Sequence, residues 1–208
     1  MADSNKVRFG LKNTHYSIIT RDENNVPTFG TPVPIPGSVA LSLSPNGSDP
    51  EPFYADDITY YMVPGINNGY KGTLELAKIP DSFHKDVLGD IEDANGLLLE
   101  NADAVSKEFA LLTEFSGDKM KTRHAIYCCT ATRSDFGSST IEESATPQTE
   151  TLNLAAIPIE FSTTVGQPGQ ETIIKHMIVK AKANPTDSPE QYNDWFTTVQ
   201  VPEFTAEA

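Results

Sequence analysis

The chain has few cysteines, and the two that it has constrain its chemistry. Cys128 and Cys129 are adjacent. Neighbouring residues of a strand point to opposite faces, so a disulfide between them would need a strained geometry. No C-x-x-C metal or redox motif is present. We therefore expect two reduced thiols, one in the core and one at the surface, as in a protein of a reducing compartment.

Positive charge and long apolar runs are also scarce. The 29 acidic residues against 15 Lys and Arg give a formal net charge of -14. This balance opposes stable binding to nucleic acid, because no basic stripe offers counterion release. No segment approaches the ~20 apolar residues of a membrane span, and the opening residues contain no apolar run of signal-peptide length. We expect synthesis in a cytoplasm and no membrane binding by this chain.

Catalytic and metal-binding signatures are missing as well. There is no G-x-S-x-G elbow, P-loop or G-x-G-x-x-G sequence, and the four histidines lack metal-ligand spacing. Residues 46–51 and the pair Asp56-Asp57 carry oxygen ligands, but their spacing is not that of an EF-hand. The sequence therefore predicts no enzyme, no catalytic residues, no cofactor and no metal.

The strongest positive signal is a strand pattern. Residues 57–63 are β-branched and aromatic on both faces, which predicts a strand covered on both sides. Residues 64–69 contain Pro, Asn and Gly, which predicts a turn into a second strand over 70–77. That second strand alternates, with Tyr70, Leu74 and Leu76 expected in the core. Its other face, formed by Lys71, Thr73 and Glu75, is polar.

Further strands are expected along most of the chain. They cover residues 7–11, 14–20, 107–115, 121–129, 149–161, 171–182 and 195–201. One helix is predicted over 80–89, with Asp81 or Ser82 as the N-cap and Gly89 just past its end. Its residues Phe83 and Val87 can pack on a sheet. A helical turn is expected at 187–192.

The irregular segments are long. Residues 21–38 contain four prolines and predict an ordered loop or extended arm, because prolines at this density cannot occupy a central strand. Residues 45–52 and 133–146 read as loops, and 163–170 as a turn.

The pattern as a whole predicts a mostly β protein. We expect two packed antiparallel sheets, in a sandwich or barrel-like arrangement, with one flanking short helix and long loops, all within a single domain of residues 1–208. The candidate core residues are Tyr70, Leu74, Leu76, Phe83, Val87, Phe109 and Leu111.

Several segments, in their order and spacing, resemble the major tail tube proteins of long, non-contractile-tailed bacteriophages. The segments are Lys6–Asn13 (KVRFGLKN), Tyr54–Tyr60 (YADDITY), Gly69–Leu76 (GYKGTLEL), Glu114–Asp118 (EFSGD), Lys121–Ala131 (KTRHAIYCCTA) and the strand 149–159. None of them is diagnostic alone, and together they span most of the chain.

The resemblance implies a virion tail subunit that forms hexameric rings. These rings stack into a tube around the tape-measure protein and later around passing DNA, with tail terminator and distal tail proteins at the ends. It also implies two packed sheets whose strands join those of neighbouring subunits in an inner barrel. Residues 21–38 and 183–208 are candidate inter-subunit elements, and Lys71, Thr73 and Glu75 are candidate lumen-facing residues. An acidic lumen would keep DNA from adhering.

Other functions share parts of this pattern. A capsid decoration or head–tail joining protein would also be soluble, acidic and rich in β-strand. A secreted adhesin or carbohydrate-binding sandwich should carry a signal peptide, and an enzyme would need a convergent polar pocket. Assembly state is what separates the tube protein from the decoration or joining protein.

Overall fold

The computed structural model describes residues 9–140, 147–165 and 172–205. Of the described residues, 51% are in strands and 7% in helices, which confirms the mostly β class. The strands are β1 (Leu11–Arg21), β2 (Pro27–Phe29), β3 (Val33–Pro34), β4 (Ser38–Ser48), β5 (Glu51–Ala55), β6 (Ile58–Val63), β7 (Ile66–Leu76), β8 (Ile91–Glu92), β9 (Leu98–Leu99), β10 (Phe109–Phe115), β11 (Arg123–Thr132), β12 (Glu150–Ala156), β13 (Ile159–Val165), β14 (Thr172–Ile178) and β15 (Lys180–Ala183). The helical elements are α1 (Asp81–Phe83), the π-helical turn η1 (His84–Leu88) and α2 (Pro189–Asn193).

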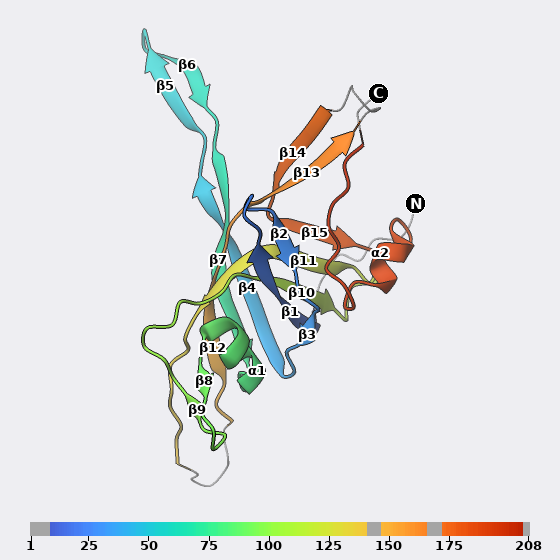
Figure 1. Ribbon diagram of the computed structural model, residues 1–208. Coiled ribbons are helices and arrows are strands. Elements are labelled where there is room, and N and C mark those ends of the chain that lie inside the picture. The colour runs from blue at the N-terminus through green and yellow to red at the C-terminus, as the bar shows by residue number, and fades with distance from the viewer. Residues whose placement is uncertain (1–8, 141–146, 166–171, 206–208) are drawn as a thin grey trace.

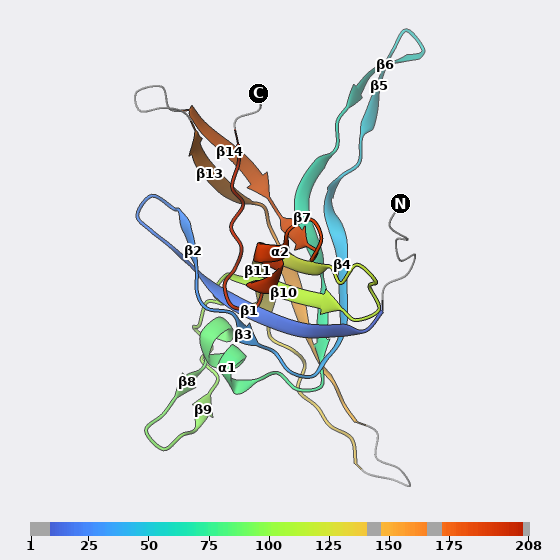
Figure 2. The same cartoon turned by 90° about the vertical axis from the view of Figure 1, so that its right-hand side faces the viewer.

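One large antiparallel sheet forms the body. Its strands follow the order β2-β1-β10-β11-β12-β7-β4, with β15 added to β11 and β3 added to β1. The sheet bends until β4 passes close to β1, so that it wraps around one side of the core (Figures 1 and 2). Three two-stranded hairpins complete the strand content: β5–β6, β8–β9 and β13–β14. The β5–β6 and β13–β14 hairpins project from the body in diverging directions (Figure 1).

The inner hydrophobic layer lies on the concave side of this sheet. Leu74 and Leu76 of β7 are fully buried there, together with Phe109 and Leu111 of β10. The short helix closes the layer. The Phe83 ring meets those of Tyr16 and Phe109 edge to face, at 5.1 and 5.4 Å between centroids.

The outer hydrophobic layer lies on the opposite side of β10 and β11. It is covered by β13–β14 and by the C-terminal segment, through Phe161, Trp195 and Val199. Cys128 faces this layer and Cys129 the inner one; both thiols are free and both are buried. The expectation of one surface cysteine is therefore wrong, because β11 is covered on both faces.

The predicted helix is confirmed as the segment Asp81–Leu88. It ends at Gly89, whose φ of 81° is the left-handed conformation that favours glycine at this position. The N-cap, however, is Pro80 and makes no side-chain capping bond, so neither Asp81 nor Ser82 has that role. Asp81 lies in the first turn, where its negative charge interacts favourably with the helix dipole. The predicted turn near 187–192 is confirmed as α2.

The predicted hairpin between 57–63 and 70–77 is wrong. β6 pairs with β5, and the turn that joins them is Asp56-Asp57, with φ of 50° and 59°. Residues 64–65 are a short break between β6 and β7 and do not reverse the chain. β7 begins at Ile66 and pairs with β4 and β12. Residues 45–52 were expected to be irregular, but most of them belong to β4 and β5. Pro45 is tolerated because β4 is an edge strand.

Other boundaries also differ from expectation. The segment 149–161 is two strands, β12 and β13, separated at Pro158, and 171–182 is split into β14 and β15. In place of strands at 7–11 and 14–20 there is the single strand β1, whose register shifts near Asn13 (φ 50°). Residues 7 and 8, the end of the predicted loop at 141–146 and most of the turn at 163–170 lie outside the described residues.

The expected strand at 195–201 is absent. Trp195 and Val199 are buried, but the chain between them forms turns and not a strand. The backbone N–H groups of Thr197 and Thr198 both donate to Asp194 O. The proline-rich segment 21–38 contains two short strands, β2 and β3, that pair with β1. These lie at the margin of the sheet, where proline is compatible with pairing.

Candidate assembly surfaces

The hairpin β5–β6 forms a projecting arm, which we define as residues 49–66. It leaves the body beyond the β4–β7 pairing and projects away from the rest of the described residues (Figures 1 and 2). Its two-residue turn, Asp56-Asp57, has positive φ at both positions, as hairpins with matching twist require. Phe53 lies opposite Tyr61 and Pro52 opposite Met62, and the register shifts between Phe53 and Tyr54.

Large apolar side chains cover both faces of the arm. Eight of them are roughly half exposed or more: Phe53, Tyr54, Ile58, Tyr60, Tyr61, Met62, Val63 and Ile66. Tyr60 is 70% exposed and Ile58 is 61% exposed. A two-stranded ribbon is marginal by itself in water, and an apolar patch of this extent marks a protein contact. The arm therefore has the character of a segment that is buried only in an assembly.

β4 presents an unpaired strand edge. It pairs with β7 on one side and ends the strand order of the large sheet on the other. The strand has 11 residues, which is long for an edge, and none of them carries a charged side chain, although Pro45 and two register shifts interrupt its regular pairing. Free backbone donors and acceptors along such an edge can pair with a strand of another chain.

The outer face of β4, β7 and β12 is polar and made of small side chains. One row across four strands is formed by Ser42, Thr73, Asn153 and Thr132, which are paired neighbours in the register. Lys71 and Glu75 of β7 lie on the same face, and Thr149 Oγ1 donates a 2.7 Å hydrogen bond to Glu75 Oε1. The three sequence-predicted lumen residues therefore share one face, on which β7 carries one positive and one negative charge.

The sequence-predicted core residues lie mostly in the inner layer. Leu74, Leu76, Phe83 and Val87 are fully buried there, as are Phe109 and Leu111. Tyr70 packs against the same layer but is only partly buried, because it lines a half-open cavity of about 210 Å³ beside β4. Lys180 lies over its ring, with Nζ 4.7 Å from the centroid.

The end of the molecule opposite the arm carries the β8–β9 hairpin. Ile91, Leu97 and Leu99 are exposed there. Arg133 anchors this region by pairing with Asp90 Oδ1 at 2.5 Å and with Glu100 Oε1 at 3.3 Å. Burial opposes ionisation of Asp90, but the hydrogen bond and charge of Arg133 outweigh it and lower the pKa of that carboxyl.

The described residues offer no metal cluster. Within residues 9–140, 147–165 and 172–205, no group of three or more His, Cys, Asp or Glu is placed to hold a metal ion. In the same ranges, no helix has the length and apolar composition to cross a membrane. The arm and the unpaired edge of β4 were not predicted from the sequence. The apolar residues on both faces of 57–63 are the signal that could have indicated the arm.

An unpaired strand edge and an apolar arm define a structural β protein whose surfaces suit protein–protein contact. The phage tail tube protein family model matches residues 2–152, and the chain belongs to this family. It is therefore a structural protein of the phage tail tube, and membership implies self-assembly into the tail and a location in the virion tail. No curated protein and no solved structure matches the chain. The match ends within β12, so β13, β14, β15 and α2 lie beyond it.

Proposed function

We propose that this protein assembles as homo-hexameric rings that stack into the tail tube, enclose the tape-measure protein and later conduct DNA during ejection. The observation that carries the proposal is the arm, whose apolar faces are exposed in the single chain. Burial of apolar surface is the dominant favourable term in most protein association. An arm of this kind is a feature of a subunit and not of an independent monomer.

Strand pairing between subunits would complete the ring. The free edge of β4 is suited to receive a strand of the next copy, which extends the sheet around the axis and removes an aggregation-prone edge. We propose that residues 1–208 act as a single tube domain and that 21–38 and 183–208 contribute contacts between copies. Exposed Val26 and Val201 in these segments are available for such contacts.

The polar face of β4, β7 and β12 is the proposed lumen wall. Ser42, Thr73 and Asn153 are small and uncharged, and Lys71 is the one cation that β7 presents on this face, so a passing duplex meets few phosphate-binding groups there. Lys71 and Glu75 offset each other on β7. The expectation of a net negative lumen potential therefore gains no support from this face, and such a potential would have to arise from acidic groups elsewhere.

The remaining partners follow from the position of a tube in the virion. The tail terminator and distal tail proteins would contact the end rings, and synthesis would take place in the host bacterial cytoplasm. The family match supports the tube over the capsid decoration or head–tail joining protein that the sequence left open.

Negative-stain electron microscopy of the purified protein tests the proposal. The wild type should form rings or tubes. The double variant Phe53→Ser and Tyr61→Ser should show only particles smaller than a ring, because these paired residues provide apolar contact area on one face of the arm. Thr59→Ala on the same arm is the matched control and should assemble normally. Circular dichroism should show the same β content for all three. Rings or tubes formed equally well by the double variant would contradict the role of the arm.

A further inference from the structure

Among the described residues, Phe136 is the most exposed large apolar side chain. It lies in the segment that follows β11 and is fully exposed. The next residue is equally open, because a Cβ added at Gly137 would meet nothing within 4 Å. The start of this segment is anchored, since Arg133 donates to Leu88 O and pairs with Asp90. The Phe136 ring is therefore held out in water from a fixed point, which favours its burial against another surface.

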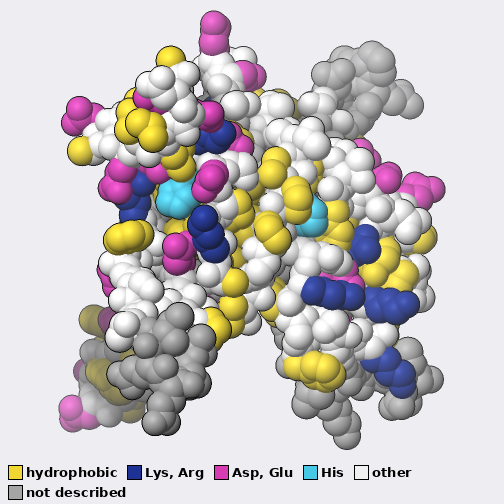
Figure 3. Space-filling model, turned by 90° about the horizontal axis from the view of Figure 1, so that it is seen from below, with side chains coloured by type: hydrophobic (Ala, Val, Ile, Leu, Met, Phe, Trp, Pro, Cys, Tyr) yellow, Lys and Arg dark blue, Asp and Glu magenta, His cyan; other side chains and the backbone are white. Residues whose placement is uncertain are grey.

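A half-open cavity lies behind β4. Its volume is about 210 Å³, and the apolar part of its wall comes from four strands: Leu41 and Leu43 of β4, Tyr70 of β7, Phe115 of β10 and Ile126 of β11. The space-filling view from below shows the molecule hollowed between two lobes, with apolar side chains at the inner end of the hollow (Figure 3). An apolar cavity of about 150 Å³ can bind a benzene molecule. The cavity behind β4 is therefore large enough for a phenyl ring.

The charges beside the ring and the cavity are complementary. Lys180 of β15 lines the cavity and is exposed, so it lies at the rim. Asp135 directly precedes Phe136 and is exposed as well. A ring that enters the cavity brings this carboxylate towards the ammonium at the rim, and complementary charges of this kind fix the orientation of a contact.

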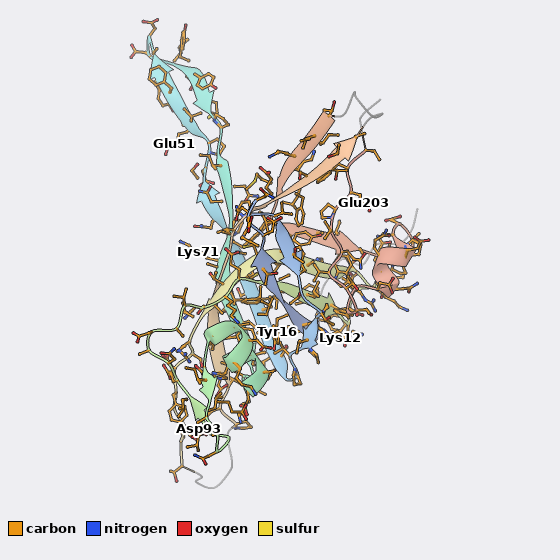
Figure 4. All side chains as sticks on the ribbon, viewed as in Figure 1. Lys12, Tyr16, Glu51, Lys71, Asp93 and Glu203 are labelled. Atoms are coloured by element: carbon orange, nitrogen blue, oxygen red, sulfur yellow. The ribbon has the colours of Figure 1, made fainter. Side chains whose placement is uncertain are left out.

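The ring and the cavity lie at opposite margins of the polar face. The strands of that face follow the order β4-β7-β12-β11. β4 carries the cavity at one margin, and β11 leads into the Phe136 segment at the other; in Figure 1 this segment descends on the left and β4 lies to the right of β7. Lys71 of the polar face points away from the body, whereas Tyr16 lies within it (Figure 4). Copies that share a lumen wall made of this face meet margin to margin within one ring, whereas successive rings meet at the strand ends.

The cleft between the β1–β2 hairpin and β13 is the competing receptor. It is larger, about 630 Å³, but Glu108 and Glu160 line it. The cations beside these carboxylates are already engaged, Arg21 with Glu108 and Lys175 with Glu160. Asp135 would meet like charges in this cleft, which disfavours it as the receptor for Phe136.

We propose that Phe136 of one copy inserts into the cavity behind β4 of its neighbour in the same ring, with Asp135 beside Lys180 at the rim. The inference rests on the proposed function and specifies which residues join neighbouring copies. The two surfaces are different, so the contact is heterologous, and its repetition by a rotation that closes gives a ring.

A disulfide between copies tests this contact. Asp135→Cys combined with Lys180→Cys replaces the proposed ion pair and leaves the Phe136 ring in place. Cys128 and Cys129 are buried, so they should not react. Oxidation of the assembled variant with diamide should give a ladder of linked chains on a non-reducing gel, because a disulfide forms only where the two Cα atoms lie within about 7 Å. Each single variant should stay monomeric on the gel.

Two further pairs test the competing occupants. Asp135→Cys with Met177→Cys reports on the cleft beside β13, and Tyr61→Cys with Lys180→Cys reports on entry of the arm into the cavity. Neither pair should link. A ladder from either of them without one from the Asp135 and Lys180 pair would show a different contact, and the inference would be wrong.

Truncation of the ring gives an independent readout. Phe136→Ala should raise the protein concentration needed for ring formation by about tenfold, as expected when an aromatic anchor of an interface is lost. Val105→Ala is the matched control, since Val105 is also exposed but lies on another loop. Both variants should keep the circular dichroism of the wild type.

The outcomes separate this inference from the proposed function. Rings and tubes formed by the wild type, without a ladder from the Asp135 and Lys180 pair or with unchanged assembly of Phe136→Ala, would overturn the inference alone. A wild type that forms neither rings nor tubes would overturn the proposed function and the inference with it.

Discussion

Cys128 and Cys129 are adjacent in β11, yet their side chains are buried in two different hydrophobic layers. Burial raises the pKa of the Cys128 thiol from 9.0 to about 11, and the nearby Glu108 carboxylate adds to the effect. Burial also raises the pKa of Cys129. The thiolate is the reactive form, so both side chains should be chemically inert in the folded protein.

Thiol alkylation tests this arrangement. At pH 8, iodoacetamide should modify both cysteines about a hundredfold more slowly in the folded protein than in guanidinium, since the rise of the Cys128 pKa from 9.0 to about 11 removes about 99% of its thiolate. Mass spectrometry of timed samples measures the rates. Rapid modification of Cys128 alone would show that β13–β14 does not cover it.

The inner layer should depend on β7. Leu74→Ala or Leu76→Ala should each lower the free energy of unfolding by about 2–5 kcal/mol, because both side chains are fully buried. Thr73→Ala between them should change it by no more than about 0.5 kcal/mol. Urea unfolding of dilute protein, followed by Trp195 fluorescence, measures all three. Leucine variants that lose less than about 1 kcal/mol would contradict the assignment of the buried face.

Acid should destabilise the protein through Glu114. Burial opposes ionisation of this carboxyl, but the hydrogen bonds from Asn13 and Lys12 and the charges of Lys12 and Arg123 prevail and lower its pKa below 4.5. A carboxyl whose pKa is lower in the folded state stabilises the fold at pH values above its unfolded-state pKa. This contribution is lost as the pH falls through the folded-state pKa.

Glu114→Gln should therefore reduce stability at pH 7 by about 1–3 kcal/mol and weaken the decline of stability below pH 4.5. Urea unfolding at several pH values checks both effects, with Glu160→Gln on the exposed β13–β14 hairpin as the control. Parallel pH curves for the wild type and Glu114→Gln would exclude this role.

The lumen assignment predicts a salt-dependent phenotype. Glu75→Lys would place two lysines per subunit on the proposed wall, and a duplex within about a Debye length, ~8 Å at physiological salt, would be attracted. Phage that carry this variant should assemble but eject DNA more slowly, and added salt should relieve the delay. Thr59→Lys on the arm is the comparison. Normal ejection at low salt would show that Glu75 faces away from the channel.

The regular strands were predictable because alternation and turn chemistry are local signals. Leu74 and Lys71 were placed on opposite faces from period two alone, and the β10–β11 pair follows from its glycine-containing turn. The Pro64–Gly69 segment misled the hairpin prediction, since its turn-forming residues lie in a long ribbon. Gly69 (φ 101°) is required there because a Cβ would lie 1.9 Å from Ala156 O.

The strand 57–63 shows why the rest could not be predicted. Its apolar residues on both faces indicate burial on both sides, and that reading is wrong for the single chain, in which every residue of β6 is exposed. A sequence pattern reflects the environment in which the protein functions. Pairing partners within one chain and between chains give the same local signal, so only the fold separates them.

The most direct test of the account is a helical reconstruction from electron cryomicroscopy of the assembled protein. The account predicts six copies around each ring, with Ser42, Thr73 and Asn153 lining a continuous channel and each arm buried against another copy. A closed particle without a channel, or a tube whose channel is lined by a different face, would contradict it.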